Sequence, residues 1–159
     1  MARYKKRIYV KKPFESTGAS NDTSANIYMS MLMSAAWREL TPKQQQLYLY
    51  CKAQYYGEKS SNLPVEHKDN PLAFTMNQSK WRDLYGLYTY ASKRYFYRDM
   101  AVLISVGLIR CIEIGSTTRT KSIYEFSDKW QKYGTPKFEV NLSEMSGHGR
   151  KYKSKITEK

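Results

Sequence analysis

The chain has 159 residues, of which 41% are hydrophobic, so it can bury one modest core but hardly two. Its 27 Lys and Arg outnumber 14 Asp and Glu, and the formal charge of +13 favours nucleic acid, an anionic membrane surface or an acidic protein as partner. Apolar stretches stay far below the roughly 18 residues of a membrane-spanning helix, and the N-terminus lacks the apolar run of a signal peptide. We therefore expect a cytoplasmic protein with no membrane partner, in which Cys51 and Cys111 are buried free thiols.

Residues 1–22 are predicted to be a flexible basic arm. Residues 1–12 contain six cations and no acid, and a stretch rich in Ser, Thr, Gly and Asn follows. This arm either lies along nucleic acid or is only a disordered terminus; in the first case its phosphate contacts come from Arg3, Lys5, Lys6 and Arg7. Residues 135–159 are also basic and are predicted to be a flexible tail, which leaves residues 23–134 as the folded domain.

The first part of this domain is predicted to be helical. Ser24 can cap a helix whose apolar residues recur at near-helical spacing and which ends near residue 40. Thr41 and Pro42 form a strong start for a second helix, because Thr caps and Pro is favoured at the first helical position. This helix is expected to end at Gly57, and a polar loop follows.

A short strand and two more helices come next. Residues 72–75 could form the strand, and Asn77 then caps a helix that closes at Gly86. Ser92 is predicted to cap a longer helix that ends at Gly107.

Two further strands complete the domain. Residues 108–114 and 122–126 are rich in β-branched and alternating residues, and the polar segment between them is typical of a hairpin turn. The order of helix, short strand, helix, tight turn, helix and hairpin predicts an α+β, mainly α fold. It is that of a winged helix-turn-helix domain with a small β-hairpin wing and an extra N-terminal helix.

The helix after Ser92 has one apolar side and one basic, aromatic side. A helical wheel places Phe96, Met100, Leu103 and Ile104 on the apolar side. On the opposite side it places Arg94, Arg98, Ala101 and Ser105, with Tyr95 and Tyr97 at the edges. The start of the second helix of a helix-turn-helix enters the major groove, where arginine can bridge guanine O6 and N7. We predict that Arg94, Arg98, Tyr95 and Tyr97 contact duplex DNA; the alternative is a solvated helix face.

Phosphate contacts, which fix register without reading sequence, are expected around the start of this helix and on the preceding one, from Ser92, Lys93, Lys80 and Arg82. At the hairpin tip, Arg119 and Lys121 could reach a phosphate or the minor groove. The alternative for these two is a polar turn that its cations keep soluble.

Several short stretches of aromatic and apolar anchors form a recognisable pattern. They are Ser34–Thr41, Leu47–Leu49, Phe96–Met100, Gly107–Ile109 and Tyr124–Trp130. Through them the chain from Ala36 to Tyr133 resembles a group of winged-helix proteins of bacterial plasmids, phages and conjugative elements. The resemblance implies double-stranded DNA binding in element replication, conjugative DNA processing or their regulation, with replication or transfer proteins of the same element as further partners.

Motifs of catalysis and metal binding are missing from the sequence. Its two histidines, His67 and His148, lack cysteines or carboxylates at ligand spacing, and we interpret Glu66 and Asp69 beside His67 as a solvated loop. There is no phosphate-cradling glycine loop or nucleophile elbow, and histidines are too few to support a tyrosine nucleophile. We expect a protein that is not an enzyme and has no cofactor.

Three functions remain open. The first is an accessory protein at an origin of replication or transfer. The second is a transcriptional repressor, which should dimerise on a symmetric operator. The methionine-rich helix of residues 24–40 is its candidate interface, although packing of that helix on the core is the interpretation we favour. The third is an RNA or protein interaction module, since the aromatic side chains could stack unpaired bases.

Overall fold

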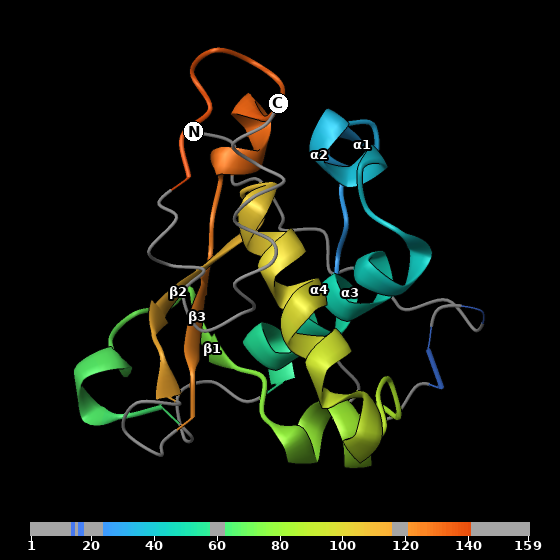
Figure 1. The fold of residues 1–159 in the computed structure, drawn as a ribbon, viewed down its shortest axis with the longest axis vertical. Helices are drawn as coiled ribbons and strands as arrows, with labels where there is room; N and C mark the ends of the chain where they lie inside the picture. Colours follow the sequence, from blue (N-terminus) through green and yellow to red (C-terminus); the bar gives the residue numbers. More distant parts are fainter. Residues whose placement is uncertain (1–13, 15, 18–23, 58–62, 116–120, 141–159) are drawn as a thin grey trace, which may run out of the picture.

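An antiparallel three-stranded sheet and the helices packed against it form an α+β fold (Figure 1). The computed structural model describes residues 14, 16–17, 24–57, 63–115 and 121–140. Most of the predicted arm, Arg119 and most of the predicted tail lie outside these residues. Within the described ranges, no helix is long and apolar enough to cross a membrane.

The strands lie in the order β1-β3-β2, with bounds Ala73–Thr75, Ile109–Glu113 and Ile123–Phe126 for β1, β2 and β3. All three therefore form where the sequence predicted strands. In the hairpin, Arg110 pairs with Glu125, and a register irregularity follows between Cys111 and Glu113. Cys111 and Cys51 are both buried thiols, as predicted, and burial raises the pKa of Cys51.

Helix α3, Pro42–Gly57, begins and ends at the predicted residues. Its start is a reciprocal cap: the Thr41 N–H donates to Gln44 Oε1 (2.9 Å), and the Gln44 N–H donates to Thr41 Oγ1 (3.4 Å). Two backbone donors that have no partner within the helix are thereby satisfied.

The single helix predicted from Ser24 to residue 40 is wrong. The chain instead forms two short helices, α1 (Met29–Leu32) and α2 (Ala35–Arg38). Ser34 is the residue that caps, because its Oγ accepts from the Trp37 N–H (3.2 Å) and donates to the Met31 carbonyl (2.7 Å). A serine side chain that bonds to the backbone in this way competes with a continuous helix.

The break between α1 and α2 decides which side chains reach the core. Trp37 of α2 is buried, whereas Met29 is 67% exposed and Met33 is also exposed. Packing of this segment on the core, the interpretation favoured from sequence, is confirmed for Ile27, Met31 and Leu32 but is wrong for these two methionines.

The helix predicted after Asn77 is present, but as a π-helical turn, η2 (Ser79–Leu84). Asn77 caps it as predicted, with Oδ1 accepting from the Lys80 N–H (3.2 Å), and Gly86 follows with φ +61°. Among the described residues, 3-10 turns also form at η1 (Val65–His67) and η4 (Lys129–Lys132).

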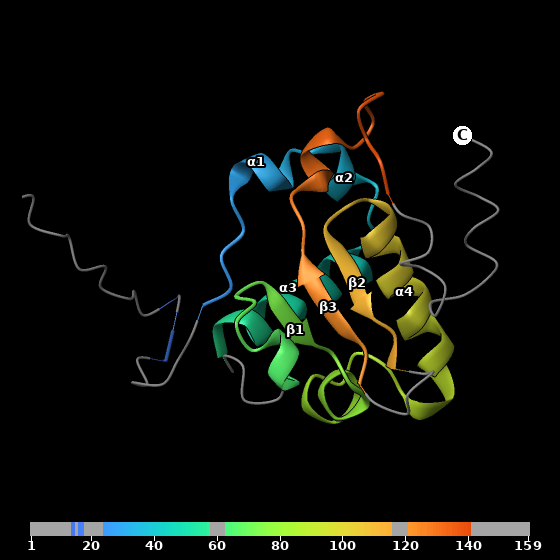
Figure 2. The same ribbon diagram turned by 90° about the vertical axis from the view of Figure 1, so that its left-hand side faces the viewer.

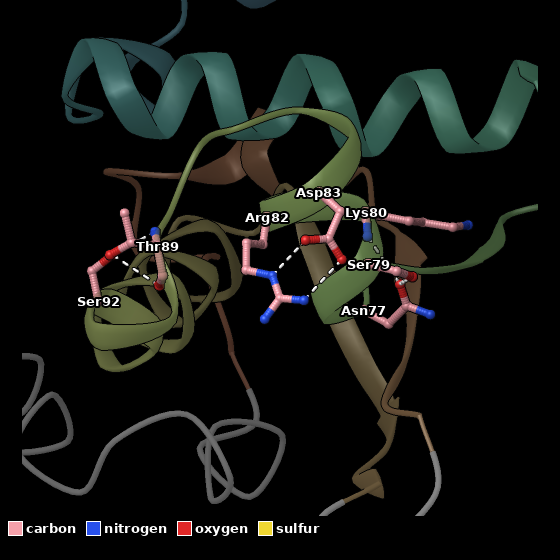
Figure 3. A network of polar contacts seen from close by, with 7 residues as sticks. All are labelled: Asn77, Ser79, Lys80, Arg82, Asp83, Thr89 and Ser92. Carbon is pink, nitrogen blue, oxygen red and sulfur yellow. Dashed lines mark hydrogen bonds and ion pairs between the residues drawn. The ribbon is translucent and has the colours of Figure 1, made fainter.

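Ser92 lies at the N-cap position of the long helix, as predicted, but its side chain makes no capping hydrogen bond to that helix. A further 3-10 turn, η3 (Tyr90–Ser92), precedes α4 (Lys93–Ser105), and Thr89 caps that turn. The Thr89 N–H donates to Ser92 Oγ (2.8 Å), so the Ser92 hydroxyl is bound to the turn before the helix (Figure 3). The turn is stabilised by its own capping box.

Helix α4 buries its predicted core side, Phe96, Met100, Leu103 and Ile104. Ala101, predicted to lie on the outer face, is buried as well. The reason is that both α3 and β2 pack against α4, so its second half is covered on more than one side. Only the first half of α4 is amphipathic in the predicted sense.

Gly107 is required by two constraints at the end of α4, where sequence predicted the stop. Its φ is +79°, and an added Cβ would lie 2.8 Å from the Trp130 backbone nitrogen. Gly86 has φ +61° but an added Cβ there would meet nothing within 4 Å.

A comparison of Gly86 with Gly107 separates the cost of backbone strain from the cost of steric clash, because only Gly107 has close neighbours. We expect Gly86→Ala to lower the free energy of unfolding by about 1–2 kcal/mol, the cost of a left-handed L-residue. Gly107→Ala should lower it by about 3 kcal/mol or more, because the backbone of η4 must also move. Chemical denaturation of the two variants measures the difference, and equal losses would contradict this account.

Candidate nucleic-acid interface

A buried carboxylate lies beneath the start of α4. Asp99 is only 1% exposed, and its two oxygens accept from three side chains. Gln44 Nε2 donates to Oδ1 (3.0 Å) and the Tyr88 hydroxyl to Oδ2 (2.8 Å). Arg98 adds Nε and Nη2, at 3.2 and 3.1 Å from Oδ1. No local pattern in the sequence indicated that Asp99, Gln44 and Tyr88 belong to one group.

The Tyr88 hydroxyl is a donor at neutral pH. Burial raises the pKa of Tyr88 far above its ordinary value, and the hydrogen bond to Asp99 raises it further. The carboxylate therefore faces donors from α3, from the turn before α4 and from α4 itself. Buried charges are tolerated only with such partners.

Arg98 connects this buried group to the surface. Its side chain is 50% exposed, while its guanidinium bonds to Asp99. The central carbon of this guanidinium lies 4.9 Å from the centroid of the Tyr95 ring. Arg94 lies at 4.8 Å from that centroid, and its Nη2 donates to the Tyr95 hydroxyl (2.9 Å). Two arginines thus share one aromatic ring that is 38% exposed.

Two lysines extend this surface. The Lys93 Nζ lies 5.8 Å from the Tyr97 ring centroid, and Tyr97 in turn packs edge-on against buried Phe96. Lys43, at the exposed start of α3, has its Nζ 4.4 Å from the Tyr88 ring centroid. The fold thus adds Lys43 to the predicted group. Sequence reasoning missed it, since no local pattern links the start of α3 to the turn before α4.

The two predicted phosphate contacts on η2 are already bound to groups of the chain. Arg82 pairs with its neighbour Asp83 (Nε–Oδ1 2.5 Å, Nη2–Oδ2 3.0 Å; Figure 3). This hydrogen bond lowers the pKa of Asp83 and raises that of Arg82. The Lys80 Nζ lies 3.5 Å from the Thr75 hydroxyl. A phosphate at Arg82 would have to displace a carboxylate.

Both ribbon views place η2, η3 and the start of α4 at one end of the molecule (Figures 1 and 2). The ends of β2 and β3 that lead to the hairpin tip lie at the same end. Lys121, at the edge of the tip, is exposed, while Arg119 lies outside the described residues. So do Arg3, Lys5, Lys6 and Arg7. The elements α1, α2 and η4 lie at the opposite end.

His67 has a different environment from the solvated loop that sequence predicted. It is half-buried, and its Nε2 lies 3.2 Å from Glu113 Oε2 on β2. Across the part of the chain that the structure describes, no group of His, Cys, Asp and Glu is arranged to hold a metal ion.

No family model, curated protein or solved structure matches the chain. The resemblance to winged-helix proteins of mobile elements accordingly stays a prediction. The candidate interface therefore rests on geometry alone. It consists of Lys43, Lys93, Arg94, Tyr95 and Arg98, which we call the basic surface.

The hydrogen bond from Tyr88 to Asp99 can be tested through stability. In Tyr88→Phe the ring contacts to Trp81 and Phe96 are kept, but a buried carboxylate oxygen loses its donor. We expect the free energy of unfolding to fall by about 1–3 kcal/mol. Tyr28, 73% exposed, provides the control: Tyr28→Phe should leave stability unchanged in the same denaturation experiment. An equally stable Tyr88→Phe would show that this bond contributes little.

Proposed function

We propose that the chain is a winged helix-turn-helix protein that binds double-stranded DNA, as an accessory protein of a mobile genetic element in replication or conjugative DNA processing. It is proposed as a cytoplasmic binding protein, not an enzyme, that needs no cofactor. Proteins of the same element's replication or transfer machinery are its proposed further partners. The basic surface at the start of α4 is the observation that carries the proposal.

The element order supports this assignment. In it, η2 and α4 correspond to the two helices of a helix-turn-helix, joined by the turn that contains Gly86. The antiparallel pair β2–β3 corresponds to the wing. The start of the second helix is the part that enters the major groove in such domains, and here it is the exposed, basic part of α4.

The charge arrangement supports a polyanion as partner. Lys43, Lys93, Arg94 and Arg98 are exposed on two helices, α3 and α4, and Asp99, the acidic residue within α4, is buried. When lysines and arginines bind DNA phosphates, the counterions condensed on the DNA are released. Binding should therefore weaken steeply as the salt concentration rises. A comparison of duplex with single-stranded oligonucleotides at two salt concentrations tests the proposal directly. A preference for single strands would contradict it and favour the RNA-binding alternative.

Arg94 is the cleanest residue with which to test the basic surface, since Arg98 also neutralises a buried charge. We expect Arg94→Ala to weaken binding to a preferred duplex by about 1–3 kcal/mol and to reduce sequence preference. The matched control is Arg38→Ala, an exposed arginine on α2 at the opposite end of the molecule. If both variants lose affinity equally, α4 is not the contacting helix.

Asp83 should oppose DNA binding if η2 lies near the phosphates. Asp83→Asn removes a negative charge and releases the Arg82 guanidinium from its ion pair. We expect duplex affinity to rise about threefold and the slope of log K against log salt to steepen by about 0.9, the effect of one more neutralised phosphate. Asp128→Asn, at the start of η4, serves as the control and should change neither quantity. An unchanged slope for Asp83→Asn would place η2 away from the DNA backbone.

A transcriptional repressor of the same fold is the second candidate. It is favoured by the exposed apolar side chains around α1, Tyr28, Met29 and Met33, which are available for self-association. A symmetric operator requires two recognition helices about one helical turn of DNA apart. Sedimentation of the full chain with and without duplex distinguishes the candidates, because the repressor requires a dimer on its site.

A further inference from the structure

We infer that Arg94 and Arg98 act as one braced unit that recognises two guanines in the major groove. The inference rests on the proposed duplex-DNA function and adds the chemistry of the target. It depends on two groups that hold the guanidinium groups in place, which we call braces. They are the ring of Tyr95, which lies between the two arginines in sequence, and the buried carboxylate of Asp99.

The first brace fixes both guanidinium groups relative to one ring. Their central carbons lie at 4.8 and 4.9 Å from the Tyr95 centroid, and Arg94 Nη2 also bonds to the ring hydroxyl (2.9 Å). An exposed arginine ordinarily loses side-chain freedom when it binds. Here part of that freedom is already lost in the unbound protein, which favours a contact of defined geometry over a mobile phosphate contact.

The second brace orients Arg98. Its Nε and Nη2 direct N–H groups at Asp99 Oδ1, at 3.2 and 3.1 Å. A guanidinium has five N–H donors in one plane, so this arrangement leaves the end of the fork, Nη1 and the second N–H of Nη2, for another pair of acceptors. Guanine O6 and N7 are such a pair, and arginine binds them in a bidentate manner.

The spacing of the two arginines limits where the guanines lie. Four residues of α-helix rise about 6 Å, and successive base pairs are about 3.4 Å apart. If the first half of α4 follows the groove, the two guanidinium groups reach bases about two steps apart. The expected target therefore contains two guanines with one base pair between them.

The experiment begins with the unaltered full chain and a pool of random duplexes. Selected sequences should be enriched in two guanines at this spacing. In the best duplex, each guanine is then replaced singly by 7-deazaguanine, which lacks the N7 acceptor but keeps the Watson–Crick pair. We expect each replacement to weaken binding about tenfold. This step changes the DNA only, so protein folding does not enter.

Protein variants then assign each guanine and test the braces. Arg94→Lys and Arg98→Lys keep the charge but lose the fork. Each should lower affinity for the selected duplex about tenfold and show no further loss with 7-deazaguanine at its own base. Tyr95→Ala should lower the ratio of specific to non-specific affinity, whereas Tyr95→Phe, which keeps the ring, should restore most of it.

The outcomes separate the inference from the proposed function. If the chain binds selected duplexes but 7-deazaguanine changes nothing, the guanine inference is overturned and duplex binding stands. If Tyr95→Ala keeps full discrimination, the bracing is overturned. If the full chain shows no preference for duplex DNA, both the proposed function and this inference fail.

Discussion

The buried charge of Asp99 is the constraint on which the rest of the structure depends. A carboxylate that is nearly inaccessible to water must be satisfied by donors, and a missing donor costs far more than a hydrogen bond contributes on balance. The donors come from Gln44 of α3, Tyr88 of the turn and Arg98 of α4. Because Gln44 also belongs to the cap of α3, the position of that helix, the conformation of the turn and the start of α4 are fixed together.

This network makes the surface a consequence of the core. Arg98 lies half in solvent because its carboxylate partner is buried one residue further along the helix. Lys43 lies over Tyr88 because the next residue in α3, Gln44, reaches the same carboxylate. Arg98 and Lys43 are thereby positioned by the packing beneath them, rather than gathered by chance on an exposed helix. Such arrangement in advance of binding is what geometric selectivity requires.

The sequence was informative where the signal is local. Thr41 with Pro42, and the glycines at 86 and 107, predicted element boundaries correctly because each acts through its own backbone geometry. Serines were less informative, since several can cap and only tertiary packing selects one: Ser34 caps α2, and the Ser92 side chain supports the turn before α4. The Asp99 network could not be predicted, because its donor on α3 lies 55 residues away in sequence.

The same distinction separates the cations of η2 from those of α4. Lys80 and Arg82 look equivalent to Arg94 in sequence, yet Arg82 forms a two-bond ion pair with Asp83, which is exposed beside it. Arg98 differs, because its acidic neighbour is buried and leaves the outer end of the guanidinium accessible. An arginine followed by an aspartate therefore has opposite consequences on η2 and on α4. The carboxylate's burial, which depends on how α3 packs on α4, decides whether the pair presents a neutral or a cationic surface to a polyanion.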